Sequence, residues 1–189
     1  MISGASGVGK TTLLRAIAGI WLYGTGTIRR EMDPRKVLFL PQQPYMQDGT
    51  LREQLFYPFD APPSQSVANS AASDRALCQA LDRVGLGHVL QRVGHDLSTC
   101  RRWSEELSVG EQQRLSVARI LVHRPAFVIL DETTAANDLA HEEAMYRCVI
   151  ETCQAFVSVG HRQSIETFHQ KKLTLLGELE GGRWTLQDI

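Results

Sequence analysis

Cysteine is scarce in this chain, and its few copies form no recognisable pattern. Cys78, Cys100, Cys148 and Cys153 include no C-x-x-C pair, and their spacing to the six histidines does not match a zinc site. Free thiols in a reducing compartment are therefore expected. The sequence does not predict a metal site built on cysteine.

Dense positive charge is also absent. The formal net charge is -1, and no run of Lys or Arg is longer than two residues. Nucleic-acid-binding surfaces usually carry clustered basic side chains. The sequence therefore predicts no nucleic-acid partner.

Long apolar runs are missing as well. No stretch approaches the roughly 18 apolar residues that suggest a membrane-spanning helix, and the N-terminus lacks the pattern of a signal peptide. We expect no segment of the given sequence to cross a bilayer. With 189 residues, of which 43% are hydrophobic, the chain can bury the core of one globular domain.

Helical and strand-like patterns alternate along the chain, which favours an α/β fold. Helices are expected over residues 11–18, in two short segments within 74–97, and over 108–123 and 138–153. Strands are expected within 24–32 (exposed), over 36–40, 126–132 and 156–160, and in a final hairpin around 172–178 and 183–187. The stretch from Tyr57 to Asp74 is rich in Pro, Ser and Ala and is expected to be a flexible connector.

The first stretch with specific chemistry is a glycine-rich loop that leads into a helix. It comprises Gly4, Ala5, Ser6, Gly7, Val8, Gly9, Lys10, Thr11 and Thr12, and it fits G-x-x-x-x-G-K-[ST]. Backbone N–H groups of such a loop can surround a polyphosphate at the positive end of the helix dipole. Lys10 would neutralise the β- and γ-phosphates, and Thr11 would hold Mg²⁺. The alternative is a glycine-rich turn that only caps a helix.

A second stretch, FVILDE, places two carboxylates at the end of an apolar strand. Ionised carboxylates are costly in such a place unless a cation or partner compensates them. Asp131 suits Mg²⁺ through water, and Glu132 suits the base that activates an attacking water. Capping of the following helix is the alternative, although Thr133, Thr134 or Asp138 could cap it at lower cost.

A third stretch, LSVGEQQR, has two explanations. Ser108 and Glu111 fit a capping box, which is a purely local role. Gly110 in the first turn of a helix costs about 1 kcal/mol relative to Ala. That cost makes sense where a phosphate of another molecule approaches the backbone closely.

In the order glycine loop, LPQQPY, LSVGEQQR, FVILDE and VGHR, the chain resembles the nucleotide-binding domain of an ABC transporter over nearly its whole length. Within that family it is most similar to the half-transporter branch that includes peroxisomal fatty-acyl and cobalamin carriers and bacterial peptide-uptake relatives. The stretches QQPYMQDGTLREQLFYP, RWSEELSVGEQQRL and GHRQSIETFH carry this resemblance.

The resemblance implies roles for further residues. Gln42 would touch Mg²⁺ or the attacking water, and His161 would contact the γ-phosphate. The signature residues Ser108, Val109, Gly110 and Glu111 would meet the ATP held by a second copy. Asp138 would end the loop that crosses between the copies. Together, Thr11, Gln42 and Asp131 would hold Mg²⁺, while Glu132, Gln42 and His161 would be catalytic.

The resemblance also implies an architecture and partners. We expect a P-loop NTPase with a mainly parallel sheet flanked by helices and a small helical lobe. Residues 1–56 and 107–189 would form the core, and 57–106 the connector and lobe. The domain would bind and hydrolyse ATP with Mg²⁺ at the cytoplasmic face of a membrane. Its partners would be a transmembrane domain and a second nucleotide-binding domain, and hydrolysis would power transport.

The chain departs from the family pattern in three places. The usual signature is Leu-Ser-Gly-Gly-Gln, whereas Val109 and Glu111 stand here at two of its positions. Ala135 and Asn137 replace a serine and a leucine in the loop that ends at Asp138. An N-terminal antiparallel sheet with an adenine-stacking aromatic residue is missing, so we expect an N-terminal truncation. Two other functions stay open: a soluble ABC ATPase of DNA repair or translation, and a non-catalytic remnant.

Overall fold

The structure is a computed structural model that describes residues 1–59, 67–177 and 183–189. The chain divides into two compact units, which are described separately. The first unit contains residues 1–42, 125–132 and 153–189, and the second contains 43–124 and 133–152. Residues 60–66 of the expected connector and residues 178–182 of the expected hairpin turn lie outside the described residues.

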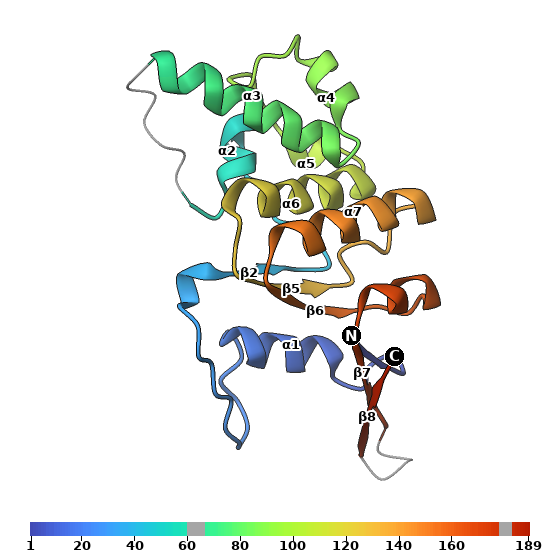
Figure 1. Ribbon diagram of the computed structural model, residues 1–189. Coiled ribbons are helices and arrows are strands. Elements are labelled where there is room, and N and C mark those ends of the chain that lie inside the picture. The colour runs from blue at the N-terminus through green and yellow to red at the C-terminus, as the bar shows by residue number, and fades with distance from the viewer. Residues whose placement is uncertain (60–66, 178–182) are drawn as a thin grey trace. The chain divides into compact units, whose positions relative to one another are not determined.

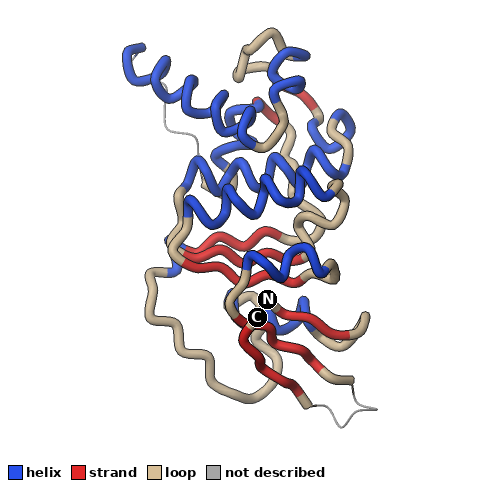
Figure 2. Tube along the Cα trace, turned by 45° about the vertical axis from the view of Figure 1, so that its right-hand side comes forward, coloured by secondary structure: helices blue, strands red, loops and turns tan. Residues whose placement is uncertain are grey.

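The first unit is built on a six-stranded sheet (Figures 1 and 2). Its strand order is β2-β5-β6-β1-β7-β8, and only β8 runs antiparallel to its neighbour. The strands are β1 (Ile2–Gly4), β2 (Val37–Leu40), β5 (Phe127–Asp131), β6 (Ala155–Val159), β7 (Lys171–Leu175) and β8 (Trp184–Asp188). The α/β class with a mainly parallel sheet is therefore confirmed.

Helix α1 (Lys10–Ala18) packs on this sheet. Its Leu14 is fully buried and meets Ile2, Ile129 and Val159 from three strands. The helix ends at Gly19, whose φ of 81° allows its N–H to reach carbonyls of the last turn. Two short 3₁₀ helices, η1 (Pro34–Lys36) and η2 (Gln163–Phe168), complete the unit. This core fixes the start of α1 next to the strand ends.

The second unit is mainly helical. Its helices are α2 (Leu51–Phe56), α3 (Val67–Arg83), α4 (Gly87–Arg92), α5 (Trp103–Glu106), α6 (Val109–His123) and α7 (Leu139–Thr152), and it also holds the short pair β3 (Gly49–Thr50) and β4 (Cys100–Arg101). Figure 1 shows α6 and α7 side by side. Leu115 and Ile120 of α6 are fully buried, as is Trp103, whose indole N–H donates to the Gly49 carbonyl at 2.8 Å.

Two expectations about local structure are wrong. Residues 24–32, all of which the structure describes, form no strand, and Ile28 among them is exposed. Strand propensity alone does not hold a strand without a paired neighbour. Val67 to Asp74 is helical as the start of α3, not a connector. Its alanines favour a helix more than its serines oppose one.

Among the described residues, no helix combines the length and the apolar character that crossing a bilayer requires.

Candidate functional site

The glycine loop joins β1 to α1 in the first unit. Gly4 ends β1 with a φ of 141°, and a Cβ at this position would lie 2.5 Å from the Leu175 carbonyl oxygen. Gly7 and Gly9 also have positive φ values, 78° and 100°. Side chains rarely adopt these conformations, so the glycines are needed for this loop shape.

Lys10 is the first residue of α1 and points back into the loop. Its ammonium donates to the carbonyl oxygens of Gly4 at 3.0 Å and Ala5 at 2.9 Å, and the residue is only 6% exposed. The Lys10 ammonium is thus held against the backbone carbonyls of the glycine loop. The next two residues diverge, because Thr12 is exposed whereas Thr11 is partly buried and faces the sheet.

Thr11 and Asp131 meet although they are far apart in sequence. The Thr11 hydroxyl donates to Asp131 Oδ1 at 2.9 Å, and Asp131 is 2% exposed at the end of β5. Burial raises the pKa of Asp131, the Thr11 hydrogen bond opposes that shift, and the charge of Glu132 adds to it. A bound cation would relieve this cost. Hydroxyl, carboxylate and amide oxygens are the donors that Mg²⁺ prefers, so Thr11, Asp131 and Gln42 fit the ion.

Glu132 lies between Gln42 and His161. Gln42 Nε2 donates to Glu132 Oε2 at 2.8 Å, and His161 Nε2 lies 3.0 Å from Glu132 Oε1. The three residues follow β5, β2 and β6, which are parallel neighbours in the sheet. Carboxyl ends of parallel strands share one edge of a sheet, which explains why these side chains converge. Glu132 has a φ of 48°, an uncommon conformation for a residue with a side chain.

The signature residues lie in the second unit at the start of α6. Ser108 caps the helix: its hydroxyl accepts from the Glu111 N–H at 3.3 Å, and its own N–H donates to Glu111 Oε2 at 2.8 Å. The predicted capping box is thus confirmed. Val109 is 59% exposed. A Cβ on Gly110 would lie 3.2 Å from the Ala136 carbonyl oxygen, so a neighbour within the same chain also favours glycine here.

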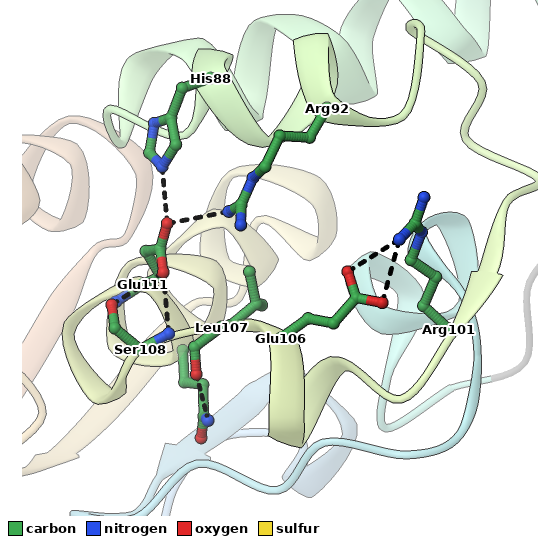
Figure 3. Close-up of polar contacts among 8 residues, drawn as sticks. His88, Arg92, Arg101, Glu106, Leu107, Ser108 and Glu111 are labelled. Atoms are coloured by element: carbon green, nitrogen blue, oxygen red, sulfur yellow. Dashed lines mark hydrogen bonds and ion pairs between the residues drawn. The ribbon is translucent and has the colours of Figure 1, made fainter.

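The Glu111 carboxylate is the centre of a polar cluster (Figure 3). Its Oε1 lies 2.6 Å from His88 Nε2 and 3.0 Å from Arg92 Nη2, both on α4. Burial pushes the pKa of Glu111 upward, but hydrogen bonds from His88 and from the Ser108 N–H and hydroxyl, with the charge of Arg92, outweigh it. The net result lowers the pKa to about 2. Glu111 is therefore ionised at neutral pH.

Asp138 caps α7. Its Oδ1 accepts from the His141 N–H at 2.8 Å, and the His141 ring nitrogen Nδ1 lies 2.9 Å from the same carboxylate. Both hydrogen bonds lower the pKa of Asp138. The neighbouring Asn137, which stands where the family usually has a leucine, is 5% exposed and donates to Gln113 Oε1 at 2.9 Å.

Three residues that contact the signature or its neighbours were not expected from the sequence: His88, Arg92 and Gln113. Gln113 Oε1 accepts from the Ala136 N–H at 3.1 Å as well as from Asn137, and so joins α6 to the loop before α7. His88 and Arg92 precede Glu111 by 23 and 19 residues. Pairing at such separations leaves no signal in one sequence, although the i, i+4 spacing of His88 and Arg92 does place them on one helix face.

The structure therefore assembles two groups of site residues. Lys10, Thr11, Gln42, the Asp131–Glu132 pair and His161 gather in the first unit. The signature residues and Asp138 belong to the second unit. Within the described ranges, no three or more His, Cys, Asp or Glu side chains cluster as a metal site would require. The donor set considered for Mg²⁺ instead combines one carboxylate with hydroxyl and amide oxygens.

Comparison with known proteins places this geometry in context. Residues 1–135 match the family model described as "ABC transporter". The chain is 43% identical over 189 residues to an "Uncharacterized ABC transporter ATP-binding protein" of Synechocystis. The alignment covers all of this chain and 27% of that protein. The chain is also 41% identical over 192 residues to the human lysosomal cobalamin transporter ABCD4. That alignment covers all of this chain and 31% of the transporter.

A solved structure shares the fold. A bacterial Atm1-family ABC exporter with ATP bound matches with a TM-score of 0.76 and 22% identity, over 99% of this chain and 33% of that chain. The chain thus spans about a third or less of the length of the proteins it matches.

Proposed function

The chain belongs to the ABC transporter family, whose ATP-binding domain it represents, and we propose that it hydrolyses ATP to drive transport through a membrane domain. The observation that carries the proposal is the position of Glu132. Gln42 and His161 both contact its carboxylate, and it directly follows Asp131, which accepts from Thr11 at the start of α1. A capping or purely structural role for Glu132 does not require two polar side chains converging on one carboxylate.

The site residues of the first unit each have a task in this reaction. The loop N–H groups bind the phosphates, and Lys10 exchanges its carbonyl partners for β- and γ-phosphate oxygens. Thr11 and Asp131 would hold Mg²⁺, assisted by Gln42. When bound, the ion offsets negative charge on the phosphates.

Glu132 accepts a proton from the attacking water. The water oxygen bonds to the γ-phosphorus while the bond from that phosphorus to the bridging oxygen breaks, which releases ADP and phosphate. Gln42 and His161 orient Glu132 and the water, and His161 also donates toward the γ-phosphate. Proton transfer to a positioned base contributes about 10²–10⁴-fold in rate.

A second copy completes the site in this proposal. Ser108 and the backbone at Gly110 of one copy contact the γ-phosphate held by the loop of the other, so two ATP molecules lie between two copies. We further propose that the domain works at the cytoplasmic face of a membrane, attached to or docked on a transmembrane domain. The family relatives, whose own lengths extend well beyond this chain, support that placement.

The replacement Glu132→Gln tests the catalytic role. Hydrolysis of Mg·ATP should fall by about 10²–10⁴-fold, because the amide cannot take the proton of water. The dissociation constant for ATP should change by less than about threefold, because the phosphate contacts remain. Phosphate release and fluorescent ATP-analogue titration measure the two quantities.

Glu143→Gln is the matched control. Glu143 is an exposed carboxylate on α7 that pairs with Arg147 of the same helix, and its loss should leave the rate unchanged. Hydrolysis that is indifferent to Glu132→Gln would remove Glu132 from its role. ATP binding that survives Lys10→Ala unchanged would remove the loop from its role.

A further inference from the structure

A carboxylate stands in the signature where the family usually has a neutral amide. Glu111 follows Ser108 by three residues, and the proposed function brings a triphosphate to Ser108. An ionised side chain so close to Ser108 would repel the phosphates unless its charge is offset. The structure shows how the chain offsets it.

The carboxylate reaches back to the start of α6, and its two oxygens accept from two different sets of donors (Figure 3). One oxygen, Oε1, faces α4 and lies 2.6 Å from His88 Nε2 and 3.0 Å from Arg92 Nη2. The other, Oε2, accepts from the Ser108 N–H and the Ser108 hydroxyl, each at 2.8 Å. The Glu111 side chain is 13% exposed and is better shielded from solvent than that of Glu106, the other acid labelled in this view, which is 37% exposed.

The Ser108 hydroxyl has a conflict to resolve. A serine hydroxyl carries one proton, and here it is donated to Glu111 Oε2 while the oxygen accepts from the Glu111 N–H. To donate to a phosphate, the hydroxyl must rotate away from the carboxylate. The more negative charge Oε2 retains, the harder that rotation becomes.

Arg92 acts on this balance from α4. A guanidinium is positive at every accessible pH and withdraws the carboxylate charge toward Oε1. His88 is one helical turn away on the same face and occupies the same oxygen. Both side chains therefore weaken the attraction of Glu111 Oε2 for the Ser108 hydroxyl. Arg92 also balances the negative charge that would otherwise face a phosphate.

We propose that Arg92, assisted by His88, is a positioning residue of the signature: it holds and neutralises Glu111 so that the Ser108 hydroxyl is available to the γ-phosphate bound by a second copy. The inference rests on the proposed function. It assigns a part in nucleotide-dependent dimer formation to α4, for which the motifs give no role.

The test is a double-mutant cycle in the Glu132→Gln chain, which should hold Mg·ATP without turnover. The dissociation constant of the Mg·ATP-dependent dimer is measured by sedimentation equilibrium. Arg92→Gln should raise this constant by about tenfold or more, a size typical of coupled charged neighbours. In the presence of Glu111→Gln, the same Arg92→Gln change should alter it by less than about twofold, because no charge is left to offset.

Two further variants separate positioning from folding. Arg92→Lys keeps the charge and should retain most of the dimer affinity. Arg101→Gln breaks a comparable arginine–glutamate pair with Glu106, away from Glu111 (Figure 3), and should leave the dissociation constant unchanged. Melting temperatures of all variants, followed by circular dichroism, show whether each is folded.

The outcomes are distinct. If Arg92→Gln weakens the dimer equally with Glu111 and with Gln at that position, or does not weaken it, the inference is overturned while the proposed function stands. If Ser108→Ala leaves the dimer intact, or the parent chain forms no dimer with Mg·ATP, the proposed function itself fails and the inference fails with it.

Discussion

At the scale of single residues, Glu132 combines the role of base proposed for it with backbone strain. Its φ of 48° is uncommon for a residue with a side chain and costs on the order of 1–3 kcal/mol. Its N–H donates to the Val159 carbonyl at 3.2 Å, which helps to hold the turn after β5. Strain of this kind persists where the surroundings over-determine it, as the contacts to Gln42 and His161 do here.

His169, which follows His161 by eight residues, is a buried histidine with hydrogen-bond partners at both ring nitrogens. Its Nε2 lies 2.9 Å from the buried Ser158 hydroxyl, and its Nδ1 lies 2.8 Å from the Ile165 carbonyl oxygen. The Ser158 contact joins the end of η2 to β6, and His161 lies in the segment between these two elements. Burial lowers the pKa of His169 to about 4, against the partial opposing effect of the Ile165 carbonyl.

The pKa of His169 predicts a pH dependence of stability. Between about pH 6.5 and 4 the unfolded chain binds a proton that the folded chain does not, so the free energy of unfolding falls as the pH falls. The slope from this residue should reach at most about 1.4 kcal/mol per pH unit. His169→Gln should remove that component, and urea unfolding at several pH values measures it.

The exposed His95, changed to Asn, is the control for that comparison. Asparagine tolerates the positive φ of 61° at that position. A His169→Gln chain whose unfolding free energy keeps the full wild-type slope between pH 6.5 and 4 would show that His169 is not held neutral in the fold.

At the scale of elements, the sequence predicts what is local and fails where pairing decides. α1 and α6 begin and end within a residue of their predicted limits, because Gly19 and the Ser108–Glu111 box mark their ends. α2 was not expected, although Thr50 and Glu53 form the same kind of box, so its signal was available. The strand predicted within residues 24–32 does not form, because a strand depends on a partner strand that the local pattern cannot supply.

The candidate site divides in the same way. Lys10, Asp131 and Glu132 could be selected from motifs, since each motif carries its own chemistry at fixed spacing. That the start of α1 lies near the Asp131–Glu132 pair follows only from the order β5-β6-β1 in the sheet. Arg92 and Gln113 could not be selected, because each acts through a partner at least 19 residues away.

Gln113 provides a prediction at this scale. Gln113→Met keeps the size of a side chain that is 2% exposed but removes the acceptor for Ala136 N–H and Asn137 Nδ2. Loss of a buried hydrogen-bond acceptor should lower the free energy of unfolding by about 1–3 kcal/mol. Urea denaturation measures this loss.

The neighbouring Gln112→Met is the matched control. Gln112 donates to the carbonyls of Ser104 and Leu107 and is less buried, so water can replace it. We expect a cost below about 1 kcal/mol. Equal costs for the two variants would contradict the role given to Gln113 between α6 and the loop before α7.

At the scale of the whole molecule, the residues proposed for ATP divide between two compact units of one chain. The loop, Asp131, Glu132, Gln42 and His161 form the first group, and the signature with Asp138 forms the second. The proposed function joins the first group of one copy to the second group of another. One copy alone would then lack a complete site, and two copies in a head-to-tail arrangement would have two.

Mixing two inactive variants tests this claim most directly. Lys10→Ala disables the loop of a chain, and Ser108→Ala disables its signature, so either chain alone should hydrolyse Mg·ATP poorly. In a mixed dimer, one site unites the intact loop of one copy with the intact signature of the other. An equal mixture should recover up to about a quarter of the wild-type rate, because half of the dimers are mixed and half of their sites are intact. A mixture no faster than the mean of the two separate variants, at concentrations where wild-type chains dimerise, would contradict the account.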